Sequence, residues 1–230
     1  MMKGKLIDLS QPFHTGMPVY HILPKTHLFR YHTFDEWDER KHWPASTDML
    51  IASTHAGTHI DAPAHMKPGV VTIDQAPLDW MWGDAVWLDF SHKKAGDEIS
   101  LPELQKTLKA EKLEITPQLI VLFHSGISRL WGTPAYKDSI IGIHIDAVTW
   151  MLDNGVKVYG MDWQSPDLDV VRLPNHQLLG KRVHHHIENL RNIDQIPFRR
   201  FTFFGLPLNL ENATASPIRA VALVQEESSE

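Results

Sequence analysis

Six short runs of apolar residues recur along the chain, and they limit the folds that it can adopt. Each run is rich in β-branched or aromatic side chains and has the length of a buried strand. We therefore expect a core built from several strands of a sheet. The runs are 5–9 (KLIDL), 86–90 (VWLDF), 119–123 (LIVLF), 156–161 (VKVYGM), 201–210 (FTFFGLPLNL) and 218–224 (IRAVALV).

Segments with helical signals lie between some of these runs. Ser100 and Glu103 have the spacing of a capping box in front of residues 104–112, LQKTLKAEK. Residues 143–154, IHIDAVTWMLDN, have a helical pattern that stops at Gly155, a residue that is common just beyond a helix end. Helices that alternate with strands in this way indicate an α/β or α+β class.

A third helix is expected over residues 182–192. Val183, Ile187 and Leu190 recur there at helical spacing. On such a helix, the consecutive histidines 184–186 would point about 100° apart and could not converge on one ion. We therefore expect these three side chains to lie mostly in solvent.

Length and charge limit the possible functions. With 230 residues, of which 43% are hydrophobic, the chain can bury a full core, and a single domain over 1–230 is the simplest arrangement. The terminal EESSE, residues 226–230, is expected to be a frayed tail. The formal net charge of −6 argues against binding to nucleic acid, which normally requires a basic face.

The signals of a membrane or secreted protein are missing from the sequence. The longest apolar runs are far shorter than the ~20 residues that span a bilayer. Asp8 comes too early for the apolar region of a signal peptide. We therefore expect a cytoplasmic protein without a membrane partner. Because the chain has no cysteine, any metal ion must be bound through nitrogen and oxygen atoms.

Residues 55–65, HAGTHIDAPAH, gather three histidines and one aspartate in a short segment. Pro63 rules out a helix interior directly after Asp61, and Gly57 permits a close approach of the backbone to other groups. A loop joined to an extended piece of chain fits these residues best.

The side chains of this segment can converge in two ways. On an extended backbone His59, Asp61 and His65 point in one direction, whereas on a single helical turn His55 and His59 share a face. Imidazole and carboxylate are usual ligands of Zn, Mn or Fe, and three protein ligands with one open position form a catalytic arrangement. Spacing alone leaves solvated or hydrogen-bonded histidines as the alternative.

HAGTHIDAPAH resembles the His-x-Gly-Thr-His-x-Asp-x-Pro-x-His signature of the metal-dependent cyclase family, which includes bacterial kynurenine formamidases and isatin hydrolases. All seven fixed positions match. The chain departs from the family pattern at Met66, His124 and Pro166, and we expect these departures to change the pocket. Four further segments are similar to family segments: 6–20 (LIDLSQPFHTGMPVY), 119–126 (LIVLFHSG), 159–167 (YGMDWQSPD) and 216–223 (SPIRAVAL).

The resemblance also implies a set of metal ligands: His55, His59, Asp61, His176 and Glu188. The first three would hold one ion, and Asp61 would bridge to a second ion that is held with His176 and Glu188. We therefore expect a divalent metal, Zn or Mn, with one or two ions per subunit, since nitrogen and oxygen ligands serve both metals.

His65, the last histidine of the segment, has a role in proton transfer in the family. Near neutral pH an imidazole can take a proton from a metal-activated water and deliver it to a departing amine, a contribution of typically ~10²–10⁴-fold. The resemblance therefore implies that His65 is catalytic rather than a metal ligand.

Other catalytic plans lack their motifs in this sequence: it has no Gly-x-Ser-x-Gly elbow, Walker-type phosphate loop or Gly-x-Gly-x-x-Gly fingerprint. Metal-assisted hydrolysis remains, in which the ion lowers the pKa of water from ~15.7 towards ~7 and hydroxide attacks a carbonyl. The resemblance implies a hydrolase that cleaves the C–N amide bond of a small aromatic substrate, such as an arylformamide like N-formylkynurenine. Opening of a cyclic amide and a non-catalytic metal-binding role are the alternatives.

The resemblance implies an α/β protein with the swivelling β/β/α fold of the family, in which helices flank a mixed sheet. Family members assemble as dimers or tetramers with pockets near the subunit contact, so we expect a homodimer or homotetramer that acts on a small molecule. Residues 34–44, FDEWDERKHWP, suit a loop over the active site, a subunit contact or a solvated loop. The tryptophan-rich residues 78–89 are expected to pack in the core or an interface, with a pocket lining as the alternative.

Overall fold

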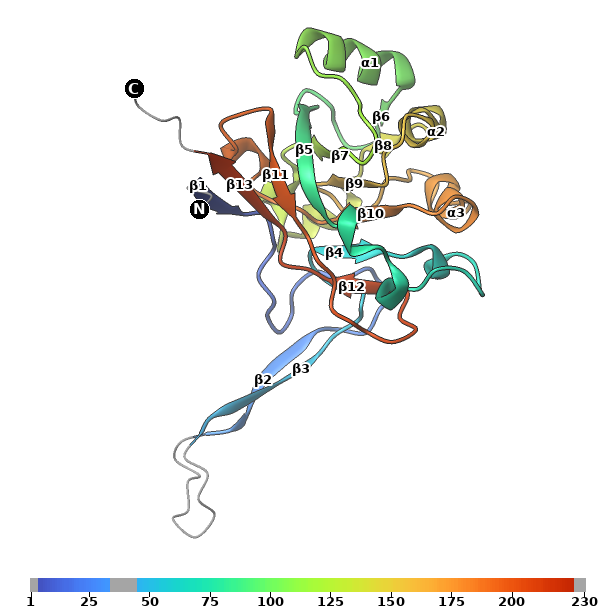
Figure 1. Cartoon of the computed structure of the whole chain (residues 1–230). Coiled ribbons are helices and arrows are strands. Elements are labelled where there is room, and N and C mark those ends of the chain that lie inside the picture. Colours follow the sequence, from blue (N-terminus) through green and yellow to red (C-terminus); the bar gives the residue numbers. More distant parts are fainter. Residues whose placement is uncertain (1–3, 34–44, 226–230) are drawn as a thin grey trace.

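The chain folds around a nine-stranded mixed sheet (Figure 1). The structure is a computed structural model, and it describes residues 4–33 and 45–225. The four central strands β5, β7, β9 and β10 run parallel, and the strands on both sides of them pair antiparallel. The strand order is β1 (Gly4–Asp8), β13 (Val221–Gln225), β11 (Arg200–Phe204), β5 (Trp82–Asp89), β7 (Ile120–His124), β9 (Val158–Met161), β10 (His185–Glu188), β4 (His59–Asp61) and β12 (Ala215–Pro217).

The central strands are buried on both faces, which is why their sequences are continuously apolar. In β7, Val121 and Phe123 join one apolar cluster, whereas Ile120 and Leu122 join a second cluster on the opposite face. Helices α1 (Leu101–Ala110) and α2 (Ile145–Asp153) cover the face of Val121 and Phe123. The predicted mixed sheet core with flanking helices is therefore confirmed.

The helix signals in the sequence correspond to real helix ends. The hydroxyl of Ser100 accepts a hydrogen bond from the backbone N–H of Glu103, and the Glu103 carboxylate accepts one from the Ser100 N–H. This capping box begins α1 as predicted. Helix α2 ends at Asp153, and Gly155 follows with a φ of +91°, a conformation that suits glycine.

The predicted helix over residues 182–192 is wrong. Residues 185–188 form strand β10 instead, which pairs with both β9 and β4. Because residues 184–190 are all buried, the segment lacks the polar alternation that identifies a half-buried strand, and periodicity alone cannot separate it from a helix. The third helix, α3 (Pro174–Lys181), comes earlier in the chain.

Several short elements complete the description. Two strands, β6 (Glu98–Ile99) and β8 (Gly142–Ile143), form a small parallel sheet. The 3-10 helices are η3 (Pro63–His65), η4 (Ile73–Gln75), η5 (Leu78–Trp80), η6 (Ile127–Leu130), η7 (Pro134–Asp138) and η8 (Ile193–Gln195). Across the described residues, no helix is both long and apolar enough to cross a membrane.

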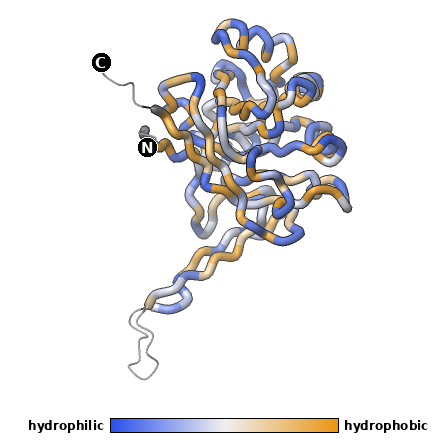
Figure 2. Tube along the Cα trace, viewed as in Figure 1, coloured by the Kyte–Doolittle hydropathy of each residue, from blue (hydrophilic) through white to orange (hydrophobic). Residues whose placement is uncertain are grey.

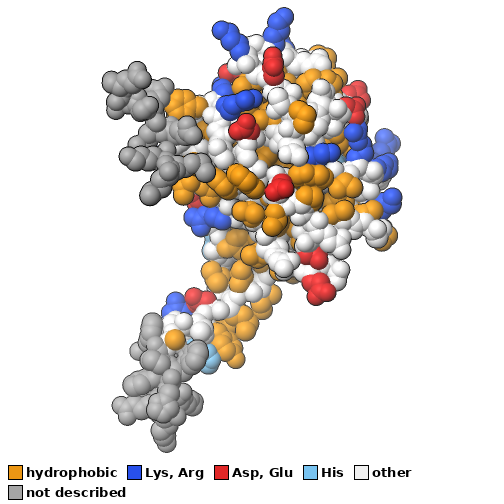
Figure 3. Space-filling model, in the orientation of Figure 1, with side chains coloured by type: hydrophobic (Ala, Val, Ile, Leu, Met, Phe, Trp, Pro, Cys, Tyr) orange, Lys and Arg blue, Asp and Glu red, His pale blue; other side chains and the backbone are white. Residues whose placement is uncertain are grey.

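A β-hairpin made of β2 (His27–His32) and β3 (Thr47–Ile51) projects away from the body of the protein (Figure 1). Hydrophobic residues follow both of its strands (Figure 2), and hydrophobic side chains gather on its surface (Figure 3). Six apolar side chains of the hairpin are between 39% and 56% exposed: Leu28, Phe29, Tyr31, Met49, Leu50 and Ile51. The aromatic segment 34–44 and the predicted tail 226–230 lie outside the described residues.

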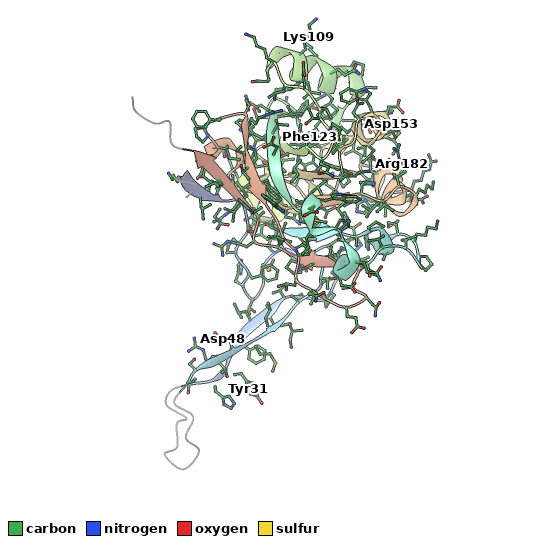
Figure 4. The ribbon with its side chains drawn as sticks, viewed as in Figure 1. Tyr31, Asp48, Lys109, Phe123, Asp153 and Arg182 are labelled. Carbon is green, nitrogen blue, oxygen red and sulfur yellow. The ribbon has the colours of Figure 1, made fainter. Side chains whose placement is uncertain are left out.

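Polar contacts join the helices on the outer surface. A guanidinium nitrogen of Arg182, the residue after α3, donates to a carboxylate oxygen of Asp153 at the end of α2, 2.7 Å away (Figure 4). Phe123 lies fully buried between the sheet and the helices in the same view. The contact between Arg182 and Asp153 joins the end of α3 to the end of α2. Helix α3 carries His176, one of the predicted ligands.

Candidate metal centre

The pairing of β4 with β10 brings the predicted ligands together. In this antiparallel pair Glu188 lies opposite His59, and Ile187 lies opposite Ile60. Because side chains alternate between the faces of a sheet, His59 and Glu188 share one face, whereas Ile60 and Ile187 point into the apolar cluster on the other face. The Nε2 atom of His59 is 3.5 Å from Oε2 of Glu188.

Asp61 lies at the centre of this face and is 1% exposed. Its Oδ1 atom is 2.8 Å from Nδ1 of His55 and 3.3 Å from Nε2 of His59. The extended backbone of β4 directs His59 and Asp61 to the same side, as the extended geometry predicts for these two residues. His65, which that geometry included, lies in the 3-10 helix η3 instead. His55 joins them from the turn before β4, where Gly57 has a φ of +65° and a Cβ would lie only 2.7 Å from the ring of Phe13.

His176 reaches the same centre from the first turn of α3. The two carboxylate oxygens of Asp167 accept hydrogen bonds from the backbone N–H groups of Asn175 and His176, and the ring Nδ1–H of His176 donates to Asp167 at 2.7 Å. The Nε2 atom of His176 therefore faces Glu188 Oε1 at 3.5 Å. Asp167, which the sequence places in the family-like segment 159–167 without a predicted role, fixes the orientation of His176.

A matching contact orients His59. Its Nδ1–H donates to the backbone carbonyl of Gly57 at 2.9 Å, which directs Nε2 at the carboxylates. The side-chain amide of Asn189 donates to the same carbonyl at 2.9 Å. The hydroxyl of Tyr136 in turn donates to Asn189, so a pocket-lining side chain is tied to the loop that carries the histidines.

The expectation that histidines 184–186 are solvated is wrong, since all three are fully buried. They lie in or next to a strand rather than on a helix, so alternate side chains share a face. His186 lies opposite Asp61, with its Nε2 atom 3.3 Å from Asp61 Oδ2 and 3.4 Å from Glu188 Oε1. The sequence reasoning missed His186, and the spacing His-x-Glu at 186–188 would have indicated it once a strand was assumed.

The neighbours of His186 have other contacts. The ring of His184 stacks on Tyr159 with 5.9 Å between the centroids, and its Nδ1–H donates to the carbonyl of Arg182. His185 points to the opposite face, where its ring lies 6.2 Å from that of Trp80, and its Nδ1–H donates to the backbone carbonyl of Asp61.

Charge interactions within the cluster are strong. Burial alone would raise the pKa of Glu188, but the nearby imidazoles of His176 and His186 lower it to about 2. Burial would lower the pKa of His59, but the adjacent carboxylate of Asp61 raises it to about 9. Burial would likewise lower the pKa of His176, but the carboxylates of Asp167 and Glu188 raise it to about 10. Buried carboxylates of this kind require positive charge beside them.

The geometry of the cluster fits divalent metal ions. Two groups have ligand atoms that all lie within 4.8 Å of one another: His55, His59 and Asp61, and Asp61, His176, His186 and Glu188. Asp61 Oδ1, Glu188 Oε1 and His186 Nε2 are buried and have no hydrogen-bond partner among the described residues. Nitrogen and oxygen donors in such groups are the ligands of Zn or Mn.

His65 lies beside the cluster without joining either group of candidate ligands. It ends the short helix η3, and its Nε2 atom is 3.9 Å from Asp61 Oδ2. Its ring is closer to that of His55, at 4.1 Å between centroids, than to that of His176, at 5.8 Å. Burial and the neighbouring imidazoles lower the pKa of His65 to about 4, although Asp61 opposes this shift.

A cavity of about 230 Å³ gives access to this cluster. His55, His59, Asp61, His65, His176 and Glu188 contribute to its wall. Most of the remaining wall is apolar or aromatic, and it includes Tyr20, Ile22, Trp131, Tyr136, Ile140 and Leu173. The volume lies below the ~300–1,000 Å³ of pockets for drug-sized ligands, which indicates a small ligand.

The sequence predicts only part of the pocket wall correctly. Of the three departures from the family pattern, Met66 lines the cavity, whereas His124 and Pro166 are not among its lining residues. His124 instead lies 3.2 Å from Asp162. The tryptophan-rich residues 78–89 do not line this cavity: Trp87 packs in the core, as the first interpretation predicts.

Comparison of the sequence with models of known protein families identifies its family. The model named Cyclase, described as "Putative cyclase", matches residues 7–168, which is more than half of the chain. The chain belongs to the Cyclase family. The resemblance drawn from the sequence is thus confirmed, and the matched region contains the whole HAGTHIDAPAH segment.

Individual relatives match most of the chain. A kynurenine formamidase from Salinibacter ruber is 31% identical over 189 residues, 80% of this chain and 84% of that protein. A kynurenine formamidase from Paracidovorax citrulli is 27% identical over 231 residues, 94% of this chain and 95% of that protein. The structure of isatin hydrolase A from Labrenzia aggregata has a TM-score of 0.85 at 23% identity and covers 96% of this chain and 94% of that one, which shows a shared fold.

Because an ion would bind the folded chain and not the unfolded one, metal is expected to raise the melting temperature of chelator-treated protein. The stabilisation is about 2.7 kcal/mol at an ion concentration of 100 Kd. Thermal melts with and without Zn²⁺ or Mn²⁺ measure the effect, and Asp61→Asn is expected to lose most of it. Equal melting temperatures with and without metal would contradict a metal centre.

Proposed function

We propose that the protein is a metal-dependent hydrolase that cleaves the C–N bond of a small arylformamide such as N-formylkynurenine. The observation that carries this proposal is the convergence of two buried carboxylates and several imidazoles, with His65 beside them, on one small apolar cavity. Two relatives that cover most of the chain are named kynurenine formamidases, which supports the substrate class.

The proposed metal ligands are His55, His59, Asp61, His176 and Glu188, with Zn or Mn as the ion. A divalent ion bound by them would lower the pKa of water towards ~7 and polarise the carbonyl of the substrate. The chain contributes the orientation of its ligands: Gly57 holds the ring of His59, and Asp167 holds the ring of His176. Such supporting contacts typically change metal affinity by ~10–100-fold.

His65 is proposed to move the proton. Its imidazole lies at the cavity wall, close to the ligands and outside their groups, where it can reach both a nucleophilic water and the leaving nitrogen. A neutral imidazole accepts a proton from the water and then, as imidazolium, protonates the departing amine. Without that second step, the amide nitrogen would leave as an unstable anion.

The cavity wall suits a flat aromatic substrate. Tyr20, Trp131 and Tyr136 surround the ligands with aromatic rings, and Gln164 and Asn189 add polar groups. Pockets that combine apolar walls with a few fixed polar groups orient small ligands. A ring of the substrate would pack among the aromatic side chains, with its amide carbonyl towards Asp61 and His65.

We also propose that the chain assembles as a homodimer or homotetramer. The apolar side chains exposed on the hairpin of β2 and β3 support this proposal, because large contiguous apolar surfaces mark interaction sites.

A small substrate panel tests the reaction. Purified metal-loaded protein is expected to release formate from N-formylkynurenine, and chelation is expected to abolish the release. Release is measured by a coupled formate assay, and isatin and related lactams serve as comparison substrates. Opening of the lactams without formate release would favour the cyclic amide alternative, and turnover that survives complete chelation would contradict metal-dependent hydrolysis.

The role of His65 is separable from metal binding. His65→Ala is expected to lower kcat by about 10²–10⁴-fold, because the proton transfer is lost. Metal content, measured by elemental analysis, should stay equal to that of the parent protein. His92→Ala, a change at an exposed histidine outside the cavity, serves as the matched control. Unchanged turnover in His65→Ala would show that this histidine does not transfer the proton.

Assembly is tested by light scattering coupled to size-exclusion chromatography. The mass is expected to be two or four times the 26.3 kDa of one chain. Leu50→Glu, which places a charge on the apolar hairpin, is expected to shift the protein towards the monomer, whereas Lys106→Glu on α1 is not. A monomeric parent protein would contradict the proposal.

A further inference from the structure

We propose that His186 is a metal ligand and that, with Asp61, His176 and Glu188, it closes a four-ligand site. The group of His55, His59 and Asp61 then supplies the site with an open position, where the reaction takes place. This inference rests on the proposed function only for the location of the reaction, and the ligand role of His186 stands on geometry alone.

The position of His186 in the sheet places it beside the carboxylates. His186 lies opposite Asp61 in the antiparallel pair, two residues before Glu188 on the same strand. All three side chains share one face, and the directly opposite pair His186 and Asp61 has the Cβ separation of about 4.5–5.5 Å that is typical of cross-strand neighbours. The paired backbone thus directs His186 at the same point as the two carboxylates.

The donor atoms of the four proposed ligands lie close together. His186 Nε2 is 3.3 Å from Asp61 Oδ2 and 3.4 Å from Glu188 Oε1, and His176 Nε2 is 3.5 Å from the same glutamate oxygen. Ligands at ~2.0–2.1 Å from a tetrahedral ion are separated by about 3.3 Å. The four separations between an imidazole and a carboxylate donor run from 3.3 to 4.0 Å, close to those of a tetrahedral set, and all four donors lie within 4.8 Å of one another.

The two oxygens of the Asp61 carboxylate face different imidazoles. Oδ1 faces His55 and His59, whereas Oδ2 faces His176 and His186. His65 Nε2 also lies 3.9 Å from Oδ2, but His65 joins neither group of candidate ligands. Each oxygen thus has two imidazoles from the candidate ligands beside it, as a carboxylate shared by two ions would.

His186 and His55 differ in their access from the cavity. His186 is fully buried and does not line the cavity, whereas His55 is only half-buried and does line it. His186 approaches from the interior, where its ring packs 5.6 Å from that of Tyr159 and 4.8 Å from that of His176. His55 thus opens the group with three ligands to the cavity, and an open position there would be the mark of a catalytic site.

Metal titration of the full-length protein tests the inference. Chelator-treated parent, His186→Gln and His186→Leu are dialysed against buffered Zn²⁺, and bound ions are counted by elemental analysis. The parent is expected to bind two ions. In both variants one of these ions is expected to bind at least ~100-fold more weakly than in the parent, a larger loss than the ~10–100-fold typical of supporting residues. His184→Gln is the matched control, since His184 is equally buried and precedes the same strand, but stacks on Tyr159.

A second measurement protects the test against a folding defect. Circular dichroism and melts of the metal-free variants report the fold, and the visible spectrum of Co²⁺-loaded parent protein reports coordination without any substitution. An intense four-coordinate spectrum for one of two Co²⁺ ions supports the closed site. Two ions bound by folded His186 variants with the affinities of the parent, or a single ion in the parent, would overturn the inference.

The outcome is distinguishable from failure of the proposed function. These measurements require no turnover, so loss of one ion in the variants would support the role of His186 even if no amide were cleaved. Conversely, formate release with unaltered metal binding in His186→Gln would leave the proposed function intact and remove the fourth ligand.

Discussion

The antiparallel pairing of β4 with β10 is the interaction on which the rest of the structure depends. Its register places Ile60 and Ile187 in the apolar core and sets Asp61 and Glu188 on the opposite face, where imidazoles surround them. A shift of one residue would reverse both faces, burying the carboxylates among apolar side chains. The burial that stabilises the sheet and the arrangement of the candidate metal centre are therefore fixed by the same register.

Buried charge is the second constraint, and it follows from the first. Two carboxylates that are almost completely buried would be costly without positive charge beside them. The imidazoles of His176 and His186 keep the pKa of Glu188 low against the effect of burial, and the ring of His176 is itself held by Asp167. A divalent ion bound at this place would supply the same positive charge, so that binding of metal and stability of the fold are coupled.

The sequence predicted six strands of the main sheet, the capping box of Ser100 and the grouping of His55 to Asp61, because these depend on residues close together in the chain. It did not predict β12, β10 or the pair of β2 and β3. The family resemblance added the distant partners His176 and Glu188, which the structure brings to the same centre. The helix over 182–192 was wrong because a strand buried on all sides has no polar alternation, and its pairing with β9 and β4 is a tertiary interaction. That error also hid His186, whose direction depends on the strand.

The central claim is that a divalent ion binds at the carboxylate of Asp61. An anomalous difference map from crystals of the Zn-loaded protein, with data collected on both sides of the zinc absorption edge, tests this claim most directly. We expect one peak beside Oδ1, near His55 and His59, and another beside Oδ2, near His176 and Glu188. A map from fully loaded crystals with no peak in contact with Asp61 would contradict the claim.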